Sequence, residues 1–326
     1  MSNFDDILNN TPKAPVPNTP AQGNRYDPNA EFSKEDYAAK KQAAREAAFS
    51  LSDSTALEVA GDSGRFRQFL DVQSQFDRYS AVNALLILAQ KPEATRLGDY
   101  DHWNEKGGFV KAKQTAIAIL EPHEYTKEDG TTGTGYNVKK VFDIAQVDTR
   151  KMNIPTPPNF TERQLLAALV HNAPMKITSV AELPGERGAM TDPDTGDITV
   201  RKGMAFADTF SSLANELTAA EVNSARAEPS IPGRMGEQYQ MRTASAFGTT
   251  SPGFTAYAAA YVLCKKYGVD TQSFNLSDAS AVFEGMDAQT SKGELSQIRS
   301  AAESVANRMA KHLDAVQKAA KNQDAR

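Results

Sequence analysis

The stretch YSAVNALLILAQ, residues 79–90, decides how the first half of this chain folds. Serine is a preferred residue at the start of a helix, because its hydroxyl accepts a hydrogen bond from a free backbone N–H group. Ser80 therefore predicts a helix over Ala81–Gln90. Apolar side chains occupy nearly every position of this helix, which predicts that it is buried on all sides.

The residues that precede this helix predict three further helices. Ser33-Lys34-Glu35-Asp36 resembles a capping box, so a helix should begin there and run through the alanine-rich stretch to Phe49. Ser52 or Ser54 is expected to begin a second, short helix. The spacing of apolar residues over Arg65–Phe76 predicts the third.

After the buried helix the sequence pattern changes from helix to strand. Thr115–Leu120 and Val138–Ile144 are short apolar and β-branched runs, which predict two strands. Between them, Lys127–Gly135 is dense in glycine, threonine and acidic residues, which favour turns. We therefore expect a long β-hairpin.

The second half of the chain is more helical. One apolar face predicts a long helix over Phe206–Arg226, and a turn between two extended arms predicts a second hairpin over Gly188–Val200. The other expected elements are a strand at Lys176–Val180 and helices at Thr161–Ala173, Gln238–Phe247, Phe254–Tyr267, Ser277–Phe283 and Glu294–Lys318.

These elements predict an α+β fold in two domains. Residues 1–32 hold five prolines and almost no large apolar side chain, so we expect this tail to be disordered. Residues 33–152 should form the first domain, of helices plus a β-hairpin, and residues 153–160, which are rich in proline, a linker. Residues 161–326 should form a second, helix-dominated domain.

The composition excludes several classes of protein. The chain has 326 residues, with 36 Lys+Arg against 41 Asp+Glu, a net charge of −5, one cysteine and four histidines. One cysteine cannot close an intramolecular disulfide, and the histidines are scattered, with no pair one helical turn apart in the sequence. No apolar run is long enough to cross a bilayer, and the acidic N-terminus lacks a signal-peptide pattern. We expect a soluble, cytoplasmic protein with no membrane partner.

A series of motifs within residues 66–148 resembles one known family. It comprises Tyr-Ser-x-x-Asn at 79–83, Gln-x-Pro-x-Ala-Thr-Arg at 90–96, Trp103, and Val-Phe-Asp-x-x-Gln at 141–146. Taken together, their order and spacing are similar to the N-terminal domain of ArdC-type antirestriction proteins, which plasmids and phages carry. The resemblance implies that the first domain binds single-stranded DNA in the cytoplasm of a bacterial host cell.

The resemblance continues more faintly to the C-terminus and implies a zincin-like metallopeptidase fold for the second domain. The zincin motif H-E-x-x-H needs two histidines one helical turn apart to hold the metal, with a glutamate as general base. The matching positions here hold Asn215 and Ala219, and only Glu216 remains. The acidic third ligand falls at Thr255 or Tyr257, neither of which has a carboxylate. The resemblance thus implies a vestigial site without metal, cofactor or catalysis.

Charge alone gives weak support for DNA binding, because residues 34–152 hold 17 Lys+Arg and 18 Asp+Glu. The resemblance also places an arginine at Gly108, which this chain lacks. Basic residues with interleaved aromatics around the hairpin are more favourable, although the size of the ring favours Trp103 as a core residue over a stacking platform. The residues that we predict to contact DNA are Arg96, Trp103, Lys106, Lys111, Lys113, Tyr136, Lys139 and Lys140.

Functions from different classes remain open. The first hypothesis is an antirestriction-like protein that binds single-stranded DNA or blocks a host defence factor, with a catalytically dead second domain. The alternative is a protein-interaction module without DNA binding, whose acidic surface docks on a basic patch of a host protein. The missing metal ligands disfavour a third interpretation, an active metallopeptidase.

Overall fold

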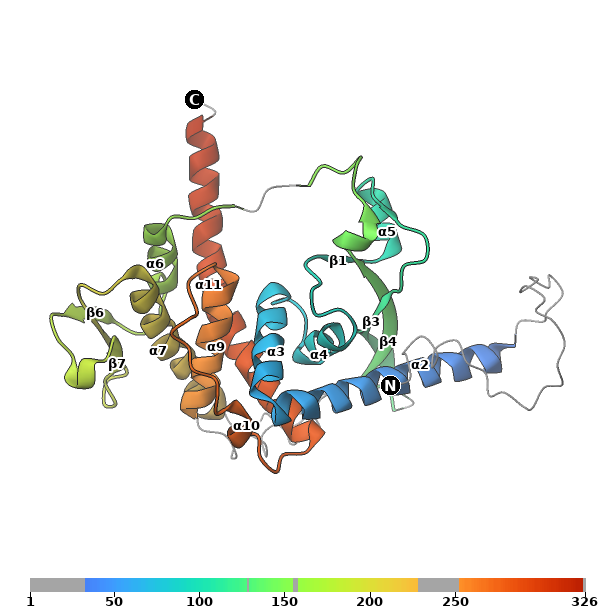
Figure 1. Ribbon diagram of the computed structural model, residues 1–326, viewed down its shortest axis with the longest axis horizontal. Helices are drawn as coiled ribbons and strands as arrows, with labels where there is room; N and C mark the ends of the chain where they lie inside the picture. The colour runs from blue at the N-terminus through green and yellow to red at the C-terminus, as the bar shows by residue number, and fades with distance from the viewer. Residues whose placement is uncertain (1–32, 128, 155–157, 228–251, 325–326) are drawn as a thin grey trace.

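The computed structural model describes most of the chain as a mixed α+β structure made mainly of helices (Figure 1). The described residues are 33–127, 129–154, 158–227 and 252–324. The predicted disordered tail, the predicted helix at Gln238–Phe247 and part of the predicted linker lie outside them. Within the described residues, no helix is both long and apolar enough to span a membrane.

The first described helix, α2 (Lys34–Gly61), begins where the capping box predicted it. The Ser33 hydroxyl accepts a hydrogen bond from the Asp36 N–H at 3.2 Å. The prediction that a second helix starts at Ser52 or Ser54 is wrong, because α2 continues through both. Their hydroxyls donate to carbonyl groups three residues earlier in the same helix, so neither acts as a cap.

Helix α3 (Ser63–Gln75) confirms the helix predicted over Arg65–Phe76, and helix α4 (Ala81–Gln90) confirms the buried helix predicted after Ser80. Asp62 caps α3 and Ser80 caps α4, each accepting a hydrogen bond from the backbone N–H three residues later. Seven of the ten residues of α4 are buried. The all-round apolar pattern thus reflects a helix enclosed by its neighbours, among which are α2 and α3.

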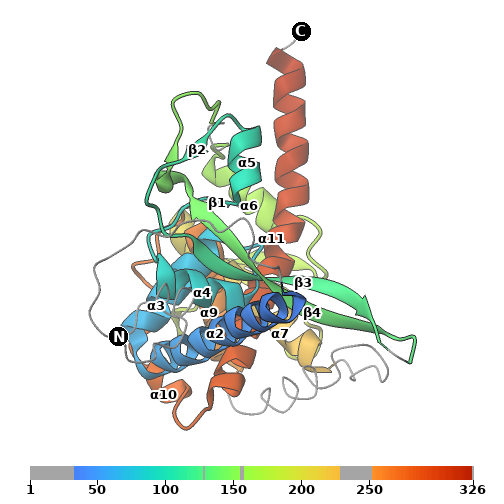
Figure 2. The same cartoon turned by 90° about the vertical axis from the view of Figure 1, so that its right-hand side faces the viewer.

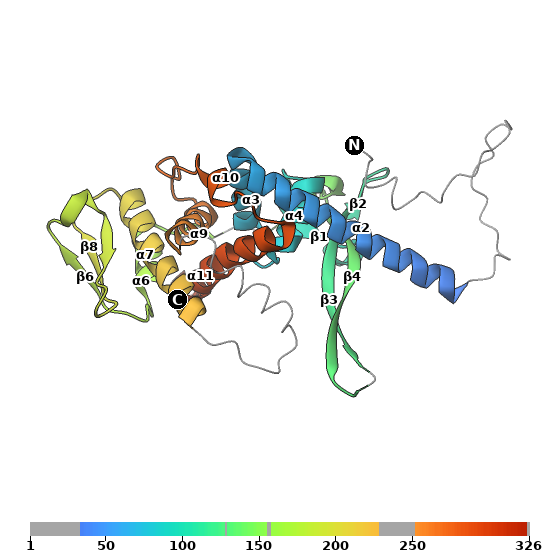
Figure 3. The same ribbon diagram turned by 90° about the horizontal axis from the view of Figure 1, so that it is seen from below.

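Strands β3 (Ile117–Thr126) and β4 (Thr132–Asp143) form the predicted long hairpin. They pair antiparallel along the whole of β3, so the turn is shorter than the predicted stretch 127–135. The short strand β1 (Leu97–Gly98) pairs with the other edge of β4, which gives the order β1-β4-β3. Figure 3 shows the tip of the hairpin extending away from the helices.

Strand β3 is the edge of this sheet, and two side chains of α4 take the place of a further strand. Asn83 Nδ2 donates to the Leu120 carbonyl and Asn83 Oδ1 accepts from the Leu120 N–H, both at 2.8 Å. Gln90 makes the same pair of bonds with Ala118, both at 2.9 Å. The asparagine and glutamine of the sequence motifs therefore satisfy backbone groups that the helix would otherwise bury unpaired.

The Val-Phe-Asp-x-x-Gln motif has a similar structural role at the other end of the sheet. Asp143, only 1% exposed, accepts backbone hydrogen bonds from Thr95, Arg96 and Ala145. It also caps the short 3₁₀ helix η1 (Ile144–Gln146), where the Gln146 side chain completes a capping box. These bonds hold the segments on either side of the sheet together.

A small lobe follows at the end of the sheet opposite the hairpin tip (Figure 2). It contains helix α5 (Tyr100–Glu105) and the antiparallel pair β2 (Phe109–Val110) and β5 (Val147–Asp148). We call residues 100–113 and 147–152 the α5–β2–β5 lobe.

The second half confirms the predicted elements that fall within the described residues. Strand β8 pairs parallel with β6 and antiparallel with β7, in the order β6-β8-β7. The helix predicted at 294–318 starts earlier and ends later. The elements are α6 (Glu162–Val170), β6 (Ile177–Val180), the 3₁₀ helix η2 (Pro184–Glu186), β7 (Ala189–Thr191), β8 (Ile198–Arg201), α7 (Phe206–Ala227), α9 (Pro252–Lys266), α10 (Ala279–Val282) and α11 (Ala288–Asp324).

One apolar core joins helices from both halves of the sequence. Phe66 of α3 packs on Phe254 of α9, with ring centroids 5.5 Å apart. Further along the same two helices, the Tyr261 hydroxyl donates to Asp71 at 2.8 Å. Helix α3 is therefore supported directly by α9, whereas α2 and α4 contact α11.

Cys264 supplies a probe of the shared core, because its thiol is fully buried. Burial raises the pKa of this thiol to about 12, so at pH 8 only about one thiol in ten thousand is ionised. We expect Ellman's reagent to label the native protein far more slowly than the urea-unfolded protein. Equal labelling rates at low and high urea would contradict the described packing of α9.

Candidate nucleic-acid interface

Trp103 lies in the core of the lobe, and the prediction that it contacts DNA is not supported by its position. Its side chain has no exposed surface, and its Nε1–H donates to the Phe142 carbonyl at 3.0 Å. Gly98 makes room for the ring, since a Cβ atom there would lie 2.9 Å from Trp103 Cε2. Because a base needs an open aromatic face for stacking, we remove Trp103 from the candidate interface.

Lys139 and Lys140 are neighbours on β4 and therefore point to opposite faces of the hairpin. The Lys139 ammonium lies 3.0 Å from a carboxylate oxygen of Asp99 and 3.0 Å from one of Glu121. Hydrogen bonds to these two carboxylates raise the pKa of Lys139 and neutralise its charge locally. Lys140 is exposed on the other face. The hairpin thus does not gather its lysines into one cationic groove.

Tyr136 and Arg96 are both accessible, and neither belongs to the lobe. Tyr136 on β4 is 39% exposed, and its ring meets Phe49 of α2 edge to face, with centroids 5.9 Å apart. Arg96 is partly exposed just before β1, and its backbone N–H donates to Asp143 at 3.0 Å.

The α5–β2–β5 lobe brings together exposed aromatic rings and lysines. Tyr100 is 54% exposed and Phe109 is 55% exposed. Lys106 and Lys111 are exposed in the same lobe, and the Lys111 ammonium donates to the Ala145 carbonyl at 2.9 Å. The sequence prediction included both lysines but missed both rings, because nothing local separates an exposed aromatic from the buried tryptophan beside it.

The lobe is also the positive part of an otherwise acidic region. It holds five basic and three acidic residues, whereas the remainder of residues 34–152 holds 12 basic and 15 acidic ones. One of the acidic residues, Asp148, forms an ion pair with Arg150 of the same lobe. Hydrogen bonds from Arg150 lower the pKa of Asp148 to about 2. The basic residues are Lys106, Lys111, Lys113, Arg150 and Lys151, and the acidic ones are Asp101, Glu105 and Asp148.

Gly108 shows why this lobe does not carry the arginine that the resemblance placed there. A Cβ atom at Gly108 would lie 2.4 Å from Met152 Sδ and 2.8 Å from Val147 Cγ1. Real Cβ contacts are never this short, so a side chain fits only if Met152 or Val147 moves. The packing of this lobe therefore favours glycine at position 108.

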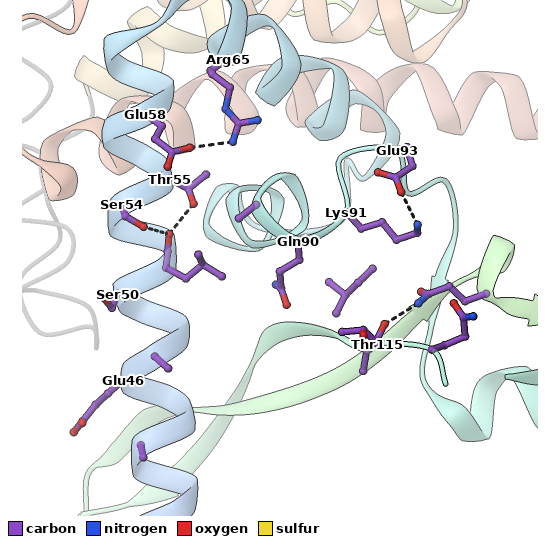
Figure 4. Close-up of a pocket in the computed structure, with 18 of the residues that line it drawn as sticks. Glu46, Ser50, Ser54, Thr55, Glu58, Arg65, Gln90, Lys91, Glu93 and Thr115 are labelled. Carbon is purple, nitrogen blue, oxygen red and sulfur yellow. Dashed lines mark hydrogen bonds and ion pairs between the residues drawn. The ribbon is translucent and has the colours of Figure 1, made fainter. Parts of the chain in front are cut away.

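Lys113 lines a different feature, a groove of about 1330 Å³ between α2, the end of α4 and the start of β3 (Figure 4). We call it the α2–β3 groove. Figure 4 shows two ion pairs among its charged side chains, and the structure gives Arg65 to Glu58 as 3.1 Å and Lys91 to Glu93 as 2.6 Å. The groove has no aromatic residue in its lining. It therefore lacks the aromatic faces on which unpaired bases stack.

The positions matched to the zincin site do not fit a divalent metal. Glu216 on α7 accepts a hydrogen bond from the Thr191 hydroxyl at 2.6 Å, so its carboxylate is part of a link to β7. Asn215 Oδ1 and Thr255 Oγ1 are buried without a hydrogen-bond partner, and Ala219 offers no donor atom. An amide and a hydroxyl do not replace the imidazole and carboxylate ligands of such a site.

Two histidines that are distant in the sequence meet in the structure. The rings of His171, at the end of α6, and His312, on α11, have centroids 4.3 Å apart. The described residues contain no group of three or more histidine, cysteine, aspartate or glutamate side chains placed to hold a metal ion.

Comparison with known proteins gives a match to one family model and a likeness to solved structures. Residues 58–156 match the model of the N-terminal domain of anti-restriction factor ArdC. Two crystal structures of the antirestriction protein ArdC from plasmid R388, one metal-free and one with bound Mn(II), are 16% identical to this chain, with TM-scores of 0.43. They cover 72% and 71% of this chain, and 86% and 85% of the solved chains are matched. No curated protein matches.

Proposed function

We propose that residues 58–156, which form an N-terminal domain of the ArdC anti-restriction type, bind single-stranded DNA through the α5–β2–β5 lobe. In this proposal the chain is an antirestriction-like protein of a plasmid or phage, and it shields entering DNA in the cytoplasm of the bacterial host.

The observation that carries the proposal is the exposure of two aromatic rings within the positive lobe. Tyr100 and Phe109 are each more than half exposed, and both belong to the lobe that carries the exposed lysines Lys106 and Lys111. Unpaired bases stack on such rings at about 1–3 kcal/mol each, and nearby lysines bind the phosphates. Neither contact requires a particular sequence, so we expect sequence-tolerant binding.

The second half of the chain has no catalytic role in this proposal. The residues at the metal-ligand positions cannot hold zinc, and a lone Glu216 cannot polarise a peptide carbonyl or acidify water. Its helices α7, α9 and α11 would then act as a scaffold, and α9 supports α3 through the shared core.

Substituting the exposed rings tests the proposal. We expect Phe109→Ala and Tyr100→Ala each to weaken binding of a fluorescent single-stranded oligonucleotide by roughly 5- to 150-fold, because each loses a stacking contact. Lys106→Ala should weaken binding by a similar factor for oligonucleotides of different sequence. It should also reduce the slope of log K against log salt concentration by about 0.7, because one phosphate contact is lost. Fluorescence anisotropy over a salt series measures both effects.

Tyr125→Ala is the matched control, since this ring is 48% exposed but lies near the hairpin tip, outside the lobe. It should bind the oligonucleotide as the unmodified chain does. Binding that shows no salt dependence would overturn DNA binding altogether, and a loss with Tyr125→Ala alone would move the interface from the lobe to the hairpin.

The excess of acidic residues outside the lobe favours the second candidate, docking to a basic host defence protein. In that case Phe109→Ala would leave the protection of DNA from a purified restriction enzyme unchanged. Under the DNA-binding proposal, Phe109→Ala should lose that protection together with oligonucleotide binding.

A further inference from the structure

A cleft beneath the hairpin is the most distinctive unassigned cavity among the described residues. It has a volume of about 1000 Å³, within the range of small-molecule sites. Its walls come from α2, the start of α4, α5, both strands of the hairpin and the first turns of α11. We call it the hairpin cleft. Its lining includes His102 of α5 but neither Tyr100 nor any residue of β2 or β5, so the exposed rings of the lobe are not part of it.

Aromatic rings line the hairpin cleft on several sides. Phe49 and Tyr136 meet edge to face at its hairpin wall, and Tyr79 and His102 line it from the segment before α4 and from α5. The Tyr79 phenol carries no charge at neutral pH, and burial raises its pKa further above that range. Rings in this arrangement provide flat apolar surfaces for a planar group.

One of the basic side chains that line the cleft has no ion-pair partner among the described residues. Lys139 is paired with Asp99 and Glu121, Lys292 with Asp53, and Arg299 with Glu303 at 2.6 Å. Arg78 also lines the cleft, and it is exposed and forms no hydrogen bond or ion pair within the described part of the chain. A free guanidinium beside aromatic walls is suited to a phosphate group.

The α2–β3 groove provides the contrast. It is larger than the hairpin cleft, yet two of its three basic side chains, Arg65 and Lys91, are paired with lining acids, and it contains no ring. Size therefore does not distinguish the two cavities, whereas the combination of aromatic walls and an unpaired arginine does.

We propose that the hairpin cleft binds one nucleotide, with the base packed against the aromatic walls and the phosphate held by Arg78. Asn83 lines the cleft but does not contact this ligand, because both ends of its amide are bound to Leu120. The nucleotide can come from two sources, a free nucleoside monophosphate or an unpaired residue of a DNA strand.

Titration of the full-length chain with dAMP, followed by isothermal calorimetry, tests the proposal. We expect dAMP to bind more tightly than deoxyadenosine or inorganic phosphate alone, since only dAMP offers both groups. Arg78→Ala should weaken dAMP binding by roughly tenfold or more, and Arg78→Lys by less. Arg65→Ala is the matched control in the α2–β3 groove and should leave dAMP binding unchanged.

Either an absence of dAMP binding or equal binding to the Arg78→Ala variant would overturn the proposal. Competition with a single-stranded oligonucleotide then identifies the source of the nucleotide. If the oligonucleotide displaces dAMP, the cleft binds a nucleotide within a strand. If dAMP stays bound, the cleft binds a free nucleotide. Phe109→Ala should retain dAMP binding, so failure of the DNA interface in the lobe is distinguishable from failure of the hairpin cleft.

Discussion

Replacing Asn83 with leucine should lower the free energy of unfolding by about 4 kcal/mol. Leucine has a similar size but cannot bond to the backbone, so the N–H and C=O groups of Leu120 lose their partners. Asn83 is 7% exposed and Leu120 is 4% exposed, so water cannot replace the lost bonds without disturbing the packing of α4. Each unpaired buried group costs about 1–3 kcal/mol, and urea denaturation measures the sum.

Asn307→Leu is the matched control, because Asn307 is exposed on α11 and is likewise a helical asparagine. Its effect should stay within about 0.5 kcal/mol. If Asn83→Leu unfolds at the same urea concentration as the unmodified chain, the edge of β3 does not depend on α4 as described.

Trp103→Ala should destabilise the protein by about 3–5 kcal/mol, which is the usual cost of removing a large buried ring. The ring is fully buried between α5 and the sheet, so its removal leaves a cavity and frees the Phe142 carbonyl. Thermal denaturation followed by circular dichroism measures the loss. This result would establish Trp103 as a core residue of the lobe.

Trp103→Phe separates stability from binding. It retains most of the ring volume and loses only the hydrogen bond of Nε1, so the lobe should keep its fold and its affinity for single-stranded DNA. Phe109→Ala should show the opposite behaviour, with normal stability and weak binding. Loss of DNA affinity in a stably folded Trp103→Phe protein would restore Trp103 to the interface.

The sequence predicted local structure well wherever the cause lies within a few residues. The Ser80 hydroxyl and the apolar run after it were enough to predict α4 with its observed ends. The prediction that a helix begins at Ser52 or Ser54 failed, although these serines have the same side chain as Ser80. A serine caps a helix only where the chain enters it from an extended conformation, and these two lie where α2 continues.

The candidate site was predicted only in part, because exposure and charge pairing depend on residues that are distant in the sequence. Lys106 and Lys111 are exposed in the lobe, as the DNA-binding prediction requires. The charge of Lys139 is instead compensated by Asp99 and Glu121, which come from other segments. The hairpin pattern gave no sign of either acid.

By itself the sequence determined most of the described helices, the hairpin and the absence of histidine at positions 215 and 219, since caps, periodicity and residue identity are local properties. Only the tertiary structure decided that Trp103 is covered while Phe109 is exposed, and that Asn83 serves the edge of β3. Burial is set by what packs against a side chain, and for these residues that is a part of the chain which no local pattern specifies.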